Sequence, residues 1–102
     1  MERTTVTCIV IVAEAFVESR LLSDLAEIGV RGWTVTRAQG HGPEDRRVSE
    51  FEGGNVRIEI LASEATVGGI WELLEEKYFA DYSIAAWDFP VAVMRSARYT
   101  TS

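Results

Sequence analysis

The chain has 102 residues, 47% of them hydrophobic, which predicts a single domain with a small core. The formal net charge of −6 argues against non-specific nucleic-acid binding, which depends on Lys and Arg neutralising phosphates. The one cysteine, Cys8, can form no internal disulfide, and no apolar run is long enough to span a bilayer. We therefore expect a cytoplasmic protein in which Cys8 is a buried structural thiol.

The first part of the chain predicts a strand followed by a helix. Residues 6–13 are largely apolar on both alternating faces, which is typical of a central strand covered on both sides. A helical period begins at Glu14 and ends before Gly29, which is placed to adopt the left-handed conformation at a helix C-terminus. The apolar stripe of this helix is Val17, Leu21, Leu25 and Ile28.

Two further strands and a second helix follow. Residues 32–38 are rich in β-branched and aromatic side chains, and residues 55–62 alternate between apolar and polar ones. Ser63 is a suitable N-cap for a helix, and close packing on the sheet or on another subunit would explain the glycines at 68 and 69. The apolar stripe of this helix is Val67, Ile70, Trp71, Leu74 and Tyr78.

The C-terminal part predicts one interrupted strand and a tail. We expect strand segments at 83–87 and 91–95, broken at Phe89 and Pro90, and a flexible polar tail at 96–102. The resulting order, βαββαβ, predicts a ferredoxin-like α+β sandwich with two helices on one face of the sheet. The other face carries apolar side chains, including Trp87, and its burial by other subunits would make the protein an oligomer.

The segment 40–54 between the second and third strands is much longer than the roughly two to five residues of a hairpin loop. Long loops of this kind are functional or disordered. The glycines at 40 and 42 could let the backbone approach an anion, although a plain turn is the simpler interpretation of the two. The adjacent cations Arg46 and Arg47 could contact a phosphate or belong to a solvated charged loop.

The remaining candidate chemistry is weak. His41 is the only histidine, which argues against a zinc or acid–base site, and no nucleophile-elbow, Walker or dinucleotide-binding spacing is present. Asp45, Glu50 and Glu52 lack the spacing of a hard-cation site. We expect no catalytic residues and no metal.

Several short motifs, in order, resemble the PII signalling superfamily. They are Gly-Trp-Thr-Val-Thr at 32–36, Gly-His-Gly at 40–42 and Glu-Gly-Gly-Asn-Val-Arg-Ile-Glu-Ile at 52–60. The runs Ser-Glu-Phe-Glu-Gly-Gly-Asn at 49–55 and Tyr-Phe-Ala-Asp-Tyr at 78–82 are similar to the PII-like branch associated with bicarbonate transporters and carboxysomes. The resemblance covers about residues 6 to 95.

This resemblance implies a ferredoxin-like homotrimer in which residues 40–54 form the T-loop. It implies that adenine nucleotides (ADP, AMP or ATP) bind in the clefts between subunits, with bicarbonate as a possible second effector and no obligatory cofactor. It also implies that the T-loop regulates inorganic-carbon uptake or carboxysome function through a bicarbonate transporter or a carboxysome-related protein.

The resemblance also implies the residues that bind the nucleotide. By residue-by-residue match, Thr34, Glu59 and Leu61 lie near the base. The glycines and arginines of the loop contact the phosphates, and Arg95 faces the nucleotide of a neighbouring subunit. The expected nucleotide-binding residues are Thr34, Gly40, Gly42, Arg46, Arg47, Glu59, Leu61 and Arg95.

The sequence departs from the usual pattern of the PII-like branch and from that of the nitrogen-sensing PII proteins, which favours ADP or AMP over ATP and argues against nitrogen sensing through 2-oxoglutarate. Glu44 stands where PII-like T-loops often have a second arginine, and Asn55 stands where the nitrogen sensors have a lysine. No tyrosine lies between residues 40 and 54, so the uridylylation site of those proteins is absent.

Another class of function stays open from the sequence alone. A small ferredoxin-like enzyme, acylphosphatase-like or of the dimeric oxygenase type, would have the same order of elements. An acylphosphatase needs an arginine and an asparagine around a phosphate loop near the N-terminus, where this chain is apolar. A trimeric metal-tolerance protein would need more metal ligands than one histidine and one cysteine.

Overall fold

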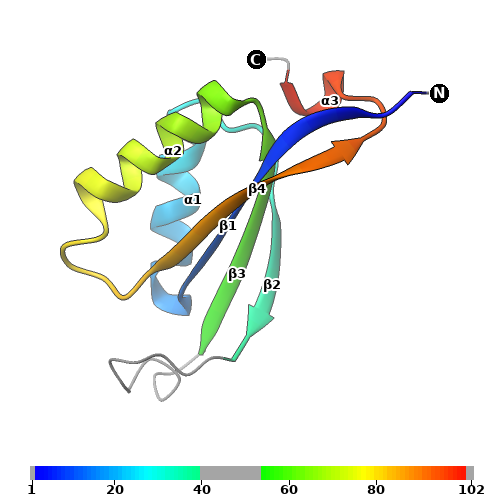
Figure 1. The fold of residues 1–102 in the computed structure, drawn as a ribbon. Helices are drawn as coiled ribbons and strands as arrows, with labels where there is room; N and C mark the ends of the chain where they lie inside the picture. Colours follow the sequence, from blue (N-terminus) through cyan, green and yellow to red (C-terminus); the bar gives the residue numbers. More distant parts are fainter. Residues whose placement is uncertain (1, 40–53, 101–102) are drawn as a thin grey trace.

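A computed structural model of the protein describes residues 2–39 and 54–100 (Figure 1). The elements in chain order are β1 (Thr4–Glu14), the 3₁₀ turn η1 (Ala15–Val17), α1 (Glu18–Glu27), β2 (Thr34–Ala38), β3 (Asn55–Ala62), α2 (Glu64–Lys77), β4 (Ala85–Val93) and α3 (Ala97–Thr100). The four strands form one antiparallel sheet in the order β2-β3-β1-β4. Helices α1 and α2 lie together on one face of this sheet (Figure 1). The predicted ferredoxin-like α+β fold is therefore confirmed.

The core lies between the two long helices and the sheet. From β1 and β3, alternate residues such as Ile9, Ile11 and Ile58 point into it, as the period of two in a strand requires. The predicted helix stripes are buried except at Trp71, which is half-buried, and at Ile28, which is 44% exposed because α1 has ended and the chain turns away at Gly29. The sequence analysis also missed Leu73, which α2 buries beside Leu74.

Both predicted helix caps are confirmed. At the end of α1, Gly29 has a φ of 105° and donates to the Ala26 carbonyl over 3.1 Å, while Val30 donates to the Leu25 carbonyl over 3.0 Å. These two bonds form a Schellman motif, and Val30 joins the core next to Leu25. At the start of α2, the Ser63 hydroxyl accepts from the Thr66 amide over 3.2 Å.

The predicted break in the last strand is wrong. Strand β4 continues through Phe89 and Pro90, which pair with Cys8 and Thr7 of β1. A proline is tolerated here because β4 is an edge strand, where a nitrogen without a hydrogen can face away from the ladder. Beyond the strand, Ala97–Thr100 form a single helical turn that the sequence analysis did not predict.

The two glycines of α2 are not explained by packing on the sheet. A Cβ atom added at Gly68 or Gly69 would meet nothing within 4 Å among the described residues. That part of the sequence-based interpretation is wrong, and packing on another subunit stays a prediction.

Neither α1 nor α2 covers the opposite face of the sheet, which we call the open face (Figure 1). Trp87 and Phe89 on this face are 42% and 40% exposed. Large apolar side chains on an uncovered sheet face are typical of a surface that associates with another molecule.

Candidate functional site

A row of four directly paired residues crosses the open face. Thr34 of β2 pairs with Glu59 of β3, Glu59 pairs with Val10 of β1, and Val10 pairs with Trp87 of β4. Directly opposite residues in antiparallel strands share a face. Two of the residues expected near a nucleotide base, Thr34 and Glu59, are therefore neighbours.

A second row lies beside the first and is apolar. Leu61, the third residue expected near the base, pairs with Cys8, which in turn pairs with Phe89. Cys8 is 5% exposed, as predicted for a structural thiol. Burial raises the pKa of this thiol, the negative charge of Glu59 raises that pKa further, and Arg57 opposes the shift. Glu59 and Arg57 thus sit close enough to the apolar row to affect its electrostatics.

The open face holds a cation that the sequence analysis left out of the site. Arg57 donates to the Glu59 carboxylate from Nε over 3.3 Å and from Nη2 over 3.1 Å. The same guanidinium lies 5.9 Å from the centre of the Trp87 ring. The period of two in β3 already placed Arg57 on the face of Glu59, so the alternation could have identified it. Nothing in the sequence indicated its contact with Trp87.

The base of the 40–54 segment lies further along the same strands. Ala38 pairs with Asn55, four residues from the Thr34 and Glu59 pair, which is about 13 Å at the rise of a strand. The Gly54 carbonyl accepts from the Ala15 amide over 2.8 Å, so η1 holds the C-terminal end of this segment. Gly40, Gly42, Arg46 and Arg47 lie outside the described residues.

Arg95 lies at the other end of the sheet. It follows β4, whose last residue Val93 pairs with Thr4 near the N-terminus, whereas the base of the 40–54 segment lies where β1 ends at Glu14 (Figure 1). Arg95 has a φ of 59°, a left-handed conformation that is uncommon for a residue with a Cβ atom. One subunit therefore does not bring Arg95 together with the base of the loop.

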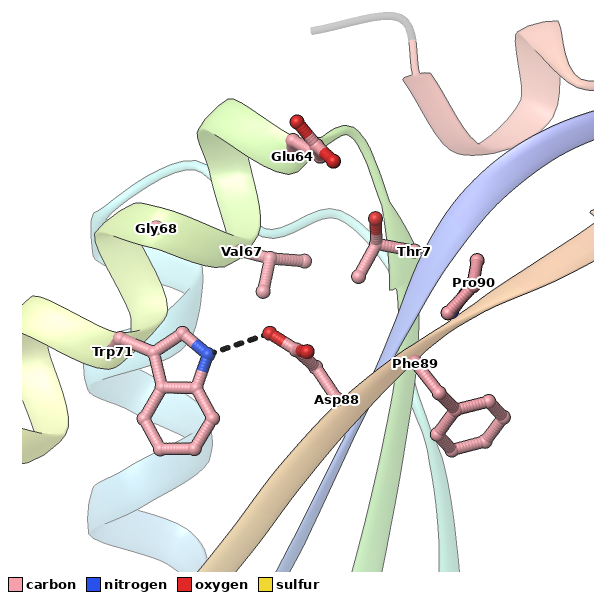
Figure 2. Close-up of a pocket in the computed structure, with 8 residues that line it drawn as sticks. All are labelled: Thr7, Glu64, Val67, Gly68, Trp71, Asp88, Phe89 and Pro90. Carbon is pink, nitrogen blue, oxygen red and sulfur yellow. Dashed lines mark hydrogen bonds between the residues drawn. The ribbon is translucent and has the colours of Figure 1, made fainter.

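A separate hollow of about 330 Å³ lies between α2 and the edge strand β4 (Figure 2). Within it, Trp71 Nε1 donates to Asp88 Oδ2 over 2.8 Å. Phe89 points away from Trp71, toward the open face (Figure 2). None of the eight residues that line this hollow is an expected nucleotide-binding residue, so it is not the predicted site.

The described residues also bear on two other expectations. Within residues 2–39 and 54–100, no group of three or more His, Cys, Asp or Glu side chains could hold a metal ion. None of the helices in these residues combines the length and the hydropathy of a membrane span.

Comparison with solved structures finds close likeness over the whole chain. A protein of Thermus thermophilus, described as a PII-like signaling protein, is 34% identical, with a TM-score of 0.83 over 97% of this chain and 99% of that one. CPII of Thiomonas intermedia K12, bound to ADP, AMP and acetate, is 18% identical, with a TM-score of 0.82 over 99% of this chain and 100% of that one. CPII bound to ADP and bicarbonate has the same identity and TM-score over 96% and 97% of the two chains. At 18% identity, the likeness to CPII shows the fold alone.

Comparison of sequences gives the family. No curated protein matched this chain. The family model for Nitrogen regulatory protein P-II matches residues 6–98, which is nearly the whole chain and takes in part or all of every strand of the sheet. The 34% identity to the Thermus protein extends over the same elements. The resemblance found in the motifs is therefore confirmed, and the chain belongs to the P-II family.

Proposed function

We propose that this protein is a signalling regulator that binds adenine nucleotides in clefts between the subunits of a homotrimer. One observation carries the proposal. Thr34 and Glu59 lie side by side on the open face, and Arg95 lies at the end of the sheet opposite the base of the 40–54 segment. A site that combines Arg95 with the 40–54 segment needs Arg95 from a second subunit, and the exposed Trp87 and Phe89 offer the surface for that association.

The chemistry of the described residues suits a purine base. The Glu59 carboxylate can accept a hydrogen bond from the exocyclic amine of adenine. Leu61, two residues further along β3, offers apolar surface to the ring. We propose that Gly40, Gly42, Arg46 and Arg47 contact the phosphates and that Arg95 of the neighbouring subunit completes their binding.

Bicarbonate is proposed as a second effector. CPII of Thiomonas intermedia K12 has been solved with ADP, AMP and bicarbonate together. By analogy, nucleotide and bicarbonate together would shift the conformations of residues 40–54 toward those that fit a partner. In our proposal the partner is a bicarbonate transporter or a carboxysome-related protein, and the regulated process is inorganic-carbon uptake.

A thermal-shift experiment tests the nucleotide site. A ligand that binds only the folded protein raises the melting temperature, and the rise grows with ligand concentration relative to Kd. We expect ADP and AMP to raise the Tm and bicarbonate to raise it further only when a nucleotide is present. Sodium chloride at matched ionic strength and constant pH is the control for bicarbonate. If no adenine nucleotide changes the Tm, the proposed function is wrong.

Hydrogen exchange across residues 43–52 tests the role of the loop. The proposal requires slower exchange with ADP and bicarbonate together than in the ligand-free protein, because ordering a backbone segment protects its amides. Equal protection in the two states would show that these residues are not the switch.

A further inference from the structure

The hydrogen bonds between Arg57 and Glu59 engage only one oxygen of the carboxylate. Both the Nε donor, at 3.3 Å, and the Nη2 donor, at 3.1 Å, reach Oε2. Neither of these bonds involves the other oxygen, Oε1. A carboxylate has about four acceptor positions, so the pair with Arg57 leaves Glu59 with capacity to accept from a ligand.

A second contact restrains Arg57, and it comes from the edge strand β4 on the same face of the sheet. Its guanidinium lies 5.9 Å from the centre of the Trp87 ring, although Arg57 belongs to β3 and Trp87 to β4. Strand β1 lies between them, so the Arg57 side chain crosses β1 near Val10 and Val12, the partners of Trp87 and Arg57 in the register. Val10 is completely buried, although neither long helix covers this face.

These two contacts fix the geometry of a planar group. An arginine guanidinium stacks on an aromatic ring and donates through a rigid fork, which a lysine ammonium cannot reproduce. Because Trp87 holds the Arg57 guanidinium on one side, the two donors of that guanidinium restrict the position of Glu59 Oε2. The orientation of the whole carboxylate, and with it the position of Oε1, is restricted as well. Thr34 is directly opposite Glu59, so the Glu59 carboxylate belongs to the part of the open face that our proposed nucleotide site uses.

We propose that Arg57 is a positioning residue that, supported by Trp87, orients Glu59 so that the site selects a 6-amino purine over a 6-keto purine. This inference rests on the proposed nucleotide site. Adenine presents an amine at position 6, which donates to Oε1. Hypoxanthine presents a carbonyl oxygen there, which faces the carboxylate without a hydrogen and is repelled by it.

Calorimetric titration of ADP and IDP tests the proposal, because the two ligands differ only in the base. We expect the wild-type protein to bind ADP at least about tenfold more tightly than IDP, since a hydrogen bond to a charged group is worth that much. Arg57→Gln should reduce this ratio several-fold, mainly by weakening ADP. Arg57→Lys keeps the charge but loses the fork, so it should reduce the ratio as well and gives a second variant if Arg57→Gln does not assemble.

Arg37→Gln is the matched control. Arg37 lies on β2 but on the helix side of the sheet, where it pairs with Glu18 at 3.4 Å. Like Arg57→Gln, this variant removes one positive charge from the sheet. It should leave the ratio of the affinities for ADP and IDP unchanged. The proposal is overturned if Arg57→Gln and Arg57→Lys keep the wild-type ratio, or if they weaken both ligands equally. If the wild-type protein binds neither ligand, the proposed function itself fails, which is a different result.

Discussion

Tyr78, directly after α2, donates a hydrogen bond from its hydroxyl to the Asp24 carboxylate of α1 over 2.5 Å. The Tyr78 ring is completely buried, and the Arg20 guanidinium lies 5.6 Å from its centre. Arg20 also donates to the Tyr82 hydroxyl over 2.7 Å. These contacts join the two helices on the side of the molecule away from the open face, so they bear on stability rather than on the proposed site.

Tyr78→Phe should lower the free energy of unfolding by about 1.5–3 kcal/mol, the usual contribution of a hydrogen bond to a charged group. Urea unfolding at one fixed protein concentration measures this, because the stability of an oligomer depends on concentration. Tyr99→Phe, on the partly exposed turn α3, is the control and should change stability by less than about 0.5 kcal/mol. Equal effects of the two substitutions would contradict the prediction.

The stability of the protein should also fall at alkaline pH, partly because of Tyr78. Burial raises the pKa of the Tyr78 hydroxyl above its ordinary 10.0, and the hydrogen bond to Asp24 raises it further. The unfolded chain therefore loses this proton first, and the folded state binds more protons above that pH. The stabilisation is fully present below pH 10 and is lost as the pH rises. In Tyr78→Phe the decline with pH should be less steep than in the wild type, and parallel curves would contradict this.

The glycine at position 68 should be replaceable with a gain in stability. Gly68 lies inside α2, and an added Cβ atom meets nothing within 4 Å in the described residues. Gly68→Ala should raise the free energy of unfolding by about 0.5–1 kcal/mol, the difference in helix propensity. Gly29→Ala is the contrasting variant, because a φ of 105° at the end of α1 is unfavourable for alanine. It should lower the stability, and a loss in Gly68→Ala would indicate that another subunit packs against α2.

The open face should be the surface through which subunits associate. Light scattering should give about three times the chain mass of 11.4 kDa if the proposed homotrimer forms. Trp87→Asp should produce smaller species, because it places a charge in the apolar interface. Ile28→Asp is the control. Ile28 is exposed to nearly the same extent as Trp87, 44% against 42%, but it lies at the end of α1 and not on the open face. A wild-type monomer, or equal behaviour of the two variants, would contradict the proposal.

Removing the loop arginine should weaken nucleotide binding without changing the oligomer. Arg47→Ala should reduce the affinity for ADP or AMP by about tenfold or more, the effect of losing one charge-assisted contact to a phosphate. Arg95→Ala should have a similar effect from the facing subunit. Arg37→Ala, on the helix side of the sheet, controls for the general loss of positive charge. Unchanged affinity in Arg47→Ala would assign this residue to the solvated charge of the loop.

The sequence by itself determined on which face of their strands the residues Thr34, Glu59 and Leu61 lie. Their placement follows from the period of two in strands, which is a property of the local backbone. The same local reasoning predicted the left-handed Gly29 and the Ser63 cap, because a helix end depends on a few adjacent residues. The order of elements then limited the topology to a ferredoxin-like sheet, since crossovers are right-handed and connections short.

Only the tertiary structure decided what depends on pairing between distant segments. That β4 runs through Pro90 follows from its place at the sheet edge, which no local pattern in 83–95 reveals. That Arg57 reaches Trp87, and that Arg95 lies at the opposite end of the sheet from the base of the 40–54 segment, depends on the register of β1 with both β3 and β4. Register is set by the fit of whole strands in the folded sheet, so residues far apart in the sequence acquire their neighbours only when the sheet forms.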